Sequence, residues 1–151
     1  MYSREDEQLS AGAYRHAVAA NISGKVGGAT LSTDLLYGTG GESVDDVYGF
    51  NVTPAYYIVP DKLQLVLRYQ YARSDGPALL LQERYEAPAG SGGRGGRGDR
   101  YHALFGGLNY YLRGNQLKLM AGLEYATMRA PEDSGADYDG WTFLTGLRVS
   151  F

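Results

Sequence analysis

The chain of 151 residues contains no cysteine and only two histidines. Without cysteine it can hold neither a disulfide framework nor a thiolate metal site. No stretch approaches the roughly 18 consecutive apolar residues that a membrane-spanning helix needs. The net charge is −3 and 44% of the residues are hydrophobic. These values argue against a strongly basic nucleic-acid binder and against a disordered chain, and the length suits one domain.

Short motifs that indicate an enzyme are also missing, since the chain has no HExxH, GxSxG or carboxylate-rich calcium loop. His16 and His102 lie near serines or aspartates along the chain, but nothing in the sequence fixes them beside a nucleophile. We interpret Asp133, Asp137 and Asp139 as part of a solvated acidic loop. We therefore expect no catalytic residue, no cofactor and no metal ligand.

The chain is rich instead in tyrosine, with 14, and in glycine, with 22. Tyrosine favours strands and suits an interface between apolar and wet surroundings. Apolar and polar residues alternate along the chain with the period of a β-strand. These strands exceed the usual length of about five or six residues and suit a tilted strand that crosses a membrane. The predicted strands are seven: 9–23, 26–37, 47–59, 63–74, 100–112, 116–128 and 140–151.

Low hydropathy does not exclude a membrane location for such strands. The mean hydropathy is −0.33, which is usual for a soluble protein. Every second residue of a spanning strand is polar, so a membrane barrel also keeps a low average.

The last strand has the most regular alternation. One face carries Phe143, Leu147, Val149 and Phe151, while Arg148 lies on the other. This pattern resembles the C-terminal signal by which the barrel-assembly machinery recognises bacterial outer-membrane barrels. We interpret these four residues as an assembly signal.

The connections alternate between short and long. Short turns are predicted at 23–25, 60–62 and 113–115, and long polar loops at 38–46, 75–99 and 129–139. Outer-membrane barrels have short periplasmic turns and longer external loops. We therefore predict an all-β fold, an antiparallel transmembrane β-barrel of the outer-membrane porin type. It forms a single barrel segment over 1–151, with a polar tail at 1–8 and a long external loop at 75–99.

An odd number of strands cannot close as a single-chain bacterial barrel. A further strand within residues 1–8 would be too short and too acidic. We therefore expect the chain to be the C-terminal part of a larger barrel.

The tract 90–98, with two arginines among its glycines, resembles a nucleic-acid-binding segment, but we interpret it as a flexible part of the long loop and expect no nucleic-acid partner.

The alternation also predicts which face meets lipid and which meets water. His16 falls on the lipid side, and Pro54 implies a bulge or weakened pairing inside its strand. The charged residues predicted to line the water-filled lumen are Arg15, Arg68, Lys118 and Arg148 against Asp34 and Glu124. The four basic residues outnumber the two acidic ones, and a basic wall raises the local anion concentration. We predict these four as a lumen anion path.

Three pieces of sequence carry a resemblance to a known family. They are Tyr-Tyr-Ile-Val-Pro-Asp-Lys-Leu at 56–63, which leads into Leu-Arg-Tyr at 67–69; Gly-Leu-Asn-Tyr-Tyr-Leu at 107–112, with Gly114 and Leu-Lys-Leu at 117–119; and Leu-Arg-Val-Ser-Phe at 147–151. With these pieces, the segment 47–151 resembles the C-terminal portion of the phosphate-selective porin O and P family.

The resemblance implies a sixteen-stranded, trimeric porin of the Gram-negative outer membrane that passes phosphate or related anions. The family's anion sites lie largely in a constriction loop and strands nearer its N-terminus, so no binding residue carries over. The expected partners are outer-membrane lipid, small anions such as phosphate, a homotrimer and the barrel-assembly machinery.

The sequence favours a porin for the passive diffusion of small anions, and two other functions remain open. The second is a non-transporting outer-membrane barrel whose long loops bind a surface partner. The third is a soluble β-barrel or sandwich that binds a small ligand, although outward rows of leucine and tyrosine argue against it.

Overall fold

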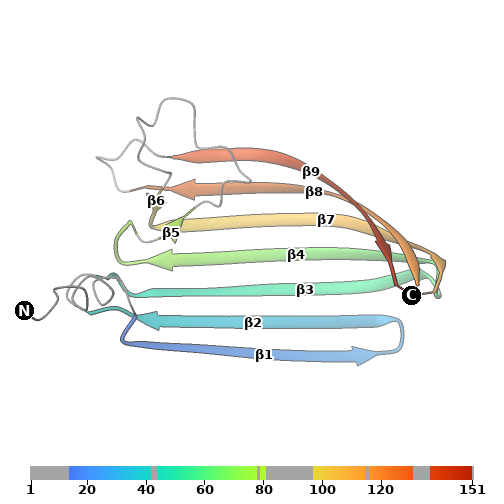
Figure 1. Cartoon of the computed structure of the whole chain (residues 1–151), viewed down its shortest axis with the longest axis horizontal. Helices are drawn as coiled ribbons and strands as arrows, with labels where there is room; N and C mark the ends of the chain where they lie inside the picture. The colour runs from blue at the N-terminus through green and yellow to red at the C-terminus, as the bar shows by residue number, and fades with distance from the viewer. Residues whose placement is uncertain are drawn as a thin grey trace, which may run out of the picture.

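The computed structural model describes residues 14–41, 44–77, 79–80, 97–114, 116–130 and 137–150. Seven long strands form one antiparallel sheet in the order β1-β2-β3-β4-β7-β8-β9 (Figure 1). Their bounds are β1 (His16–Val26), β2 (Ala29–Thr39), β3 (Val47–Val59), β4 (Leu63–Ser74), β7 (Arg100–Arg113), β8 (Leu117–Arg129) and β9 (Tyr138–Val149). Two short strands, β5 (Leu79–Leu80) and β6 (Arg97–Gly98), pair with each other.

The sheet is a meander with two free edges. Each long strand pairs with the next long strand along the chain, so β1 and β9 form the edges of the described sheet. The sheet curves, but it is not closed into a barrel. The prediction of an all-β antiparallel fold is therefore confirmed, while the transmembrane barrel stays a prediction. No helix in the described part of the chain is long and apolar enough to cross a membrane.

Most strand bounds agree with the alternation in the sequence. The bounds of β3 and β4 match the predicted ranges, and those of β7, β8 and β9 differ by one or two residues. Two of the predicted turns also occur, one at 60–62, where Lys62 N donates to Val59 O at 3.1 Å, and one after β7, where Gln116 N donates to Arg113 O at 3.0 Å. Residues 1–8 and Phe151 lie outside the described residues, as does most of the tract 90–98.

The first hairpin differs from the prediction. Its turn is formed by Gly27 and Gly28 rather than by residues 23–25, so β1 ends at Val26, which pairs with Ala29. Gly27 has φ +56°, a left-handed conformation that glycine adopts without steric cost. A two-residue hairpin turn requires such conformations. Lys25 therefore belongs to β1 and not to the turn.

Pro54 lies within β3 and opposite Leu31 of β2. On its other side β3 pairs with β4. This pairing is interrupted at residues 53 and 54, and it resumes at Ala55 in the same register. Proline has no N–H for the ladder, which explains weakened pairing there. The bulge of this strand pair lies nearer the turn, between Tyr57 and Val59.

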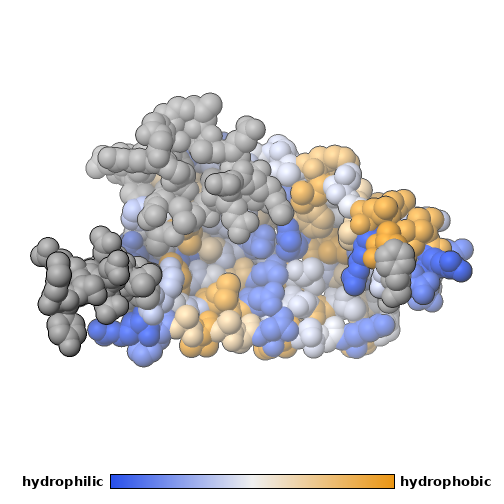
Figure 2. Space-filling view, in the orientation of Figure 1, coloured by the Kyte–Doolittle hydropathy of each residue, from blue (hydrophilic) through white to orange (hydrophobic). Residues whose placement is uncertain are grey.

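The two faces of the sheet differ in chemistry. Directly opposed residues of neighbouring strands share a face, so the register shows on which face of the sheet each side chain lies. We call one face the apolar face; it carries large exposed side chains: Val18, Ile22, Leu31, Leu35, Leu67, Leu104, Leu108, Leu119, Leu123, Trp141, Phe143 and Leu147. The polar face carries amide, hydroxyl and charged side chains among small residues and a few large apolar ones, of which Leu36 is 60% exposed. Hydrophilic residues cross the middle of the face in view in Figure 2.

Candidate functional site

The centre of the polar face holds an ion pair that spans three strands. Arg68 on β4 donates from Nη2 to Glu124 Oε2 on β8 at 2.5 Å. Phe105 on β7 lies between them in the register, opposite both residues. The side chain of Glu124 is only 1% exposed and that of Arg68 is 33% exposed. The pair therefore joins strands that are not neighbours.

Two glycines make room for this arrangement. A Cβ atom at Gly107 would lie 2.6 Å from the Phe105 ring, and one at Gly122 would lie 2.5 Å from it. The ring thus occupies space that any other residue at these positions would fill. The Arg68 guanidinium lies above the ring, with Cζ 5.1 Å from its centroid, which is a favourable cation–π geometry.

The pairing changes the role predicted for Arg68. The residue lies on the polar face, as the alternation predicts, but its charge is offset by Glu124. Its Nε atom is buried and has no hydrogen-bond partner among the described residues. The centre of the polar face therefore adds little net positive charge.

Basic residues concentrate at the turn end of the polar face. Lys118 on β8 and Arg148 on β9 are directly opposite each other, and Lys118 Nζ lies 5.5 Å from the Tyr111 ring centroid. Like charges directly opposite each other destabilise a sheet, and the Tyr111 ring near the Lys118 ammonium offsets part of that cost. Lys25 lies on the same face near the turn end of β1, opposite Thr30.

Sequence reasoning missed Lys25 because it placed the first turn too early. The Gly-Gly dipeptide at 27–28 was the available signal, since it marks a tight turn. We call Lys25, Lys118 and Arg148 the basic turn-end residues.

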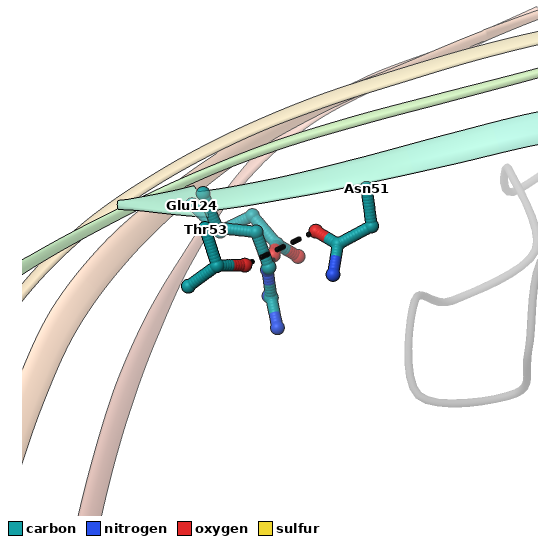
Figure 3. Close-up of polar contacts among 4 residues, drawn as sticks. Asn51, Thr53 and Glu124 are labelled. Atoms are coloured by element: carbon teal, nitrogen blue, oxygen red, sulfur yellow. Dashed lines mark hydrogen bonds and ion pairs between the residues drawn. The ribbon is translucent and has the colours of Figure 1, made fainter. Parts of the chain in front are cut away.

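An amide cluster surrounds the one acidic residue of β2 on this face. Asn21 and Asn51 lie on either side of Asp34 in the register. Their side-chain amides donate to the two Asp34 oxygens, at 2.5 and 2.9 Å. Thr53 in turn donates to Asn51 Oδ1 at 3.3 Å. Figure 3 shows Asn51, Thr53 and Glu124 on the concave side of the curved strands.

A second network supports the position of Tyr111. Gln64 on β4 accepts hydrogen bonds from Asn109 at 3.0 Å and from the Tyr111 hydroxyl at 2.8 Å. The Tyr111 ring also contacts Tyr57, with 5.6 Å between centroids. This network places an aromatic ring beneath the Lys118 ammonium.

The remaining predicted site residues lie elsewhere. Arg15 is exposed just before β1, where its backbone N donates to Thr39 O at 2.8 Å. Phe143, Leu147 and Val149 are exposed on the apolar face of β9.

Both histidines belong to the apolar face, and His102 Nδ1 lies 2.9 Å from the Tyr69 hydroxyl. In the described ranges, His, Asp and Glu side chains form no group of three or more that could hold a metal ion.

Comparisons with protein-family models, with curated proteins and with solved structures found no match. The resemblance to phosphate-selective porins therefore stays a hypothesis, and the function has to be argued from the two faces of the sheet.

Proposed function

We propose that the chain forms part of the wall of an outer-membrane porin that passes small anions, phosphate among them, by passive diffusion. The observation that carries the proposal is the contrast between the two faces of one curved sheet. One face exposes large apolar side chains, and the other carries hydrogen-bonded polar groups and basic residues.

The apolar face supports a lipid environment. Ile22, Phe143 and Trp141 are 69%, 68% and 72% exposed, and similar residues cover the sheet from β1 to β9. Soluble monomers rarely expose so large a contiguous apolar surface, because each Å² of apolar surface in contact with water costs about 25 cal/mol of free energy. In a bilayer this cost disappears. Tyrosines near the two ends of the strands, such as Tyr48 and Tyr110, suit the interfacial belts of a membrane barrel.

The polar face supports a water-filled lumen. Its central ion pair is neutral overall, so the basic turn-end residues dominate the electrostatic potential near the turns. A positive wall raises the local anion concentration and lowers the barrier to entry. Diffusion of this kind needs neither a catalytic residue nor a cofactor.

The free edges support a larger barrel. In a seven-strand antiparallel meander, β1 and β9 run in the same direction. Antiparallel closure therefore needs an odd number of further strands, of which the first and last run opposite to β1. The family resemblance suggests nine such strands and a trimeric assembly. We propose that the assembly machinery recognises the C-terminal segment through Phe143, Leu147 and Val149 of β9 and through Phe151, which lies outside the described residues.

Ion selectivity tests the proposal. The protein is extracted from outer membranes and inserted into planar bilayers with a salt gradient. We expect a reversal potential that indicates anion preference, and a shift toward cations in the K25Q/K118Q/R148Q variant. R73Q/R100Q/R129Q removes the same charge from the apolar face at the opposite end of the strands, so it is the matched control and should leave the potential unchanged. Equal selectivity in all three proteins would contradict the proposal.

One observation favours the non-transporting barrel as a second candidate. At the loop end of the polar face, Ser74, Ala103, Ala126 and Met128 are at most 3% exposed, and Gly98 of β6 packs against the Met128 side chain. Strand β6 thus lies beside the polar face at this end. Replacing residues 78–98 by a short linker should raise conductance if this segment obstructs a pore, and should abolish partner binding without creating conductance if the loops carry the function.

A further inference from the structure

The polar face is hollowed by a groove between its central ion pair and the turns. The groove has a volume of about 300 Å³ and is lined by residues of β4, β7, β8 and β9. Glycines form part of its floor, since Gly107, Gly122 and Gly146 line it. Gly107 and Gly122 are buried and lie directly opposite each other. A volume of this size is at the lower end of the range for ligand pockets, so it suits a small solute.

The walls of the groove are apolar, although the face around it is rich in polar groups. The four wall residues are Val66, Phe105, Met120 and Leu144. Val66 on β4 and Leu144 on β9 flank the two paired glycines in the register. All four are half-buried, so each presents part of its apolar surface to the groove. Walls of this kind favour a solute with an apolar body.

Cationic side chains also line the groove. Arg68 lies at the end near the ion pair, and Lys118 lies at the end near the turns. Arg68 is already bound to Glu124 at 2.5 Å, whereas Lys118 is directly opposite Arg148, which adds a second positive charge. The turn end therefore attracts the anionic group of a solute more strongly than the other end does.

We propose that this groove binds small aromatic carboxylates as they pass through the lumen. The carboxylate pairs with Lys118, while the ring lies over the glycine floor and contacts Phe105 and Met120. A phenyl ring and a thioether both make favourable contacts with an aromatic ring. Gly122 and Lys118 are four residues apart on β8, which is about 13 Å along a strand and suits one ring with its carboxylate. The inference rests on the proposed passage of anions and names a class of solute whose apolar body distinguishes it from phosphate.

The test measures how benzoate blocks the chloride current through the protein, extracted from outer membranes and inserted into planar bilayers at neutral pH. A solute that binds in the lumen reduces this current. We expect benzoate to block wild type at a concentration at least about tenfold lower than acetate, which lacks the ring, or benzyl alcohol, which lacks the charge. Met120→Gln makes one wall polar with little change in its length and should raise the half-blocking concentration of benzoate about tenfold. Lys118→Gln should raise it as well.

Leu36→Gln is the matched control for the wall variant. Leu36 is 60% exposed on the same face, but it lies on β2 and does not line the groove. The control therefore makes a similar chemical change outside the groove and should leave the block by benzoate unchanged. Binding of fluorobenzoate, followed by fluorine NMR in detergent, should rank wild type and the three variants in the same order.

Several results would overturn the inference. Equal block by benzoate and acetate would show that charge alone decides, and equal block by benzyl alcohol would show that the cation has no part. An unchanged block in Met120→Gln, or an equal loss in Leu36→Gln, would place the site outside the groove. An anion-selective pore that benzoate does not block contradicts this inference alone. A pore without anion preference contradicts the proposed function, and fluorine NMR then still decides whether the groove binds the carboxylate.

Discussion

Arg68 and Glu124 form an ion pair at 2.5 Å although a complete strand, β7, separates their backbones. The pair crosses above Phe105, whose ring fills the space over two glycines. The pair joins β4 to β8 and offsets the charge of Arg68 at the centre of the polar face. Changes to either partner should therefore affect both stability and ion selectivity.

The two partners should shift selectivity in opposite directions. Glu124→Gln leaves the Arg68 charge without its counter-ion, so we expect stronger anion preference. Arg68→Gln removes a hydrogen-bond donor from a buried carboxylate, so we expect weaker anion preference and a loss of about 2 kcal/mol in the free energy of unfolding. Reversal potentials and urea unfolding in lipid measure the two effects. Shifts of the same sign would show that the pair does not set the lumen charge.

Alanine at Gly122 should destabilise the protein because its Cβ collides with Phe105. The collision distance of 2.5 Å indicates overpacking, which costs about 1–3 kcal/mol. Gly106→Ala is the matched control, because a Cβ there lies 3.5 Å from Leu67, an ordinary contact. Urea unfolding compares the two. A Phe105→Leu substitution should recover part of the loss in the Gly122→Ala variant, and no recovery would rule out the ring as the cause.

The first hairpin should depend on Gly27. Its φ of +56° costs other residues about 1–2 kcal/mol, so Gly27→Val should lower the free energy of unfolding by that amount. Gly24→Val, three residues earlier in the same hairpin, places its Cβ where no described atom lies within 4 Å. Equal unfolding midpoints for the two variants would contradict the assigned turn.

The end of β8 should respond to acid through Asp137. Hydrogen bonds from the Ala130 N–H and the Arg129 guanidinium hold the pKa of the Asp137 carboxyl below its ordinary value of 3.8. A lowered folded pKa contributes stability that is fully present above 3.8 and is lost as the pH falls through the folded pKa. An NMR titration of the Ala130 amide should therefore show a transition below 3.8, and Asp137→Asn should remove it. A transition that persists in the variant would assign the effect to another group.

Local patterns predicted the strands well because alternation is a local property. β3 and β4 match their predicted bounds, and β9 was recognised from its regular apolar positions. The error at the first hairpin arose because residues 23–25 and 27–28 both contain turn-forming glycine, and only the register of β1 against β2 distinguishes them.

Contacts between strands were much less predictable. Arg68 and Glu124 were both placed on the polar face, but nothing local indicates that they meet across β7. The placement of Arg73, Arg100 and Arg129 across three neighbouring strands was also missed, because Arg73 and Arg100 stood at the ends of predicted strands and Arg129 in a predicted loop. Only the pairing register places these three side by side.

We propose that the apolar face meets lipid and the polar face meets water, and spin labels on β9 test this most directly. The chain has no cysteine, so single cysteines on β9 can be spin-labelled without background. Phe143→Cys and Thr142→Cys are adjacent in sequence and lie on opposite faces. In lipid-reconstituted protein, we predict that oxygen dissolved in the bilayer speeds the relaxation of the spin label at 143. A water-soluble nickel chelate should instead speed the relaxation of the label at 142. Access of the nickel chelate to both positions, or the reverse pattern, would contradict the account.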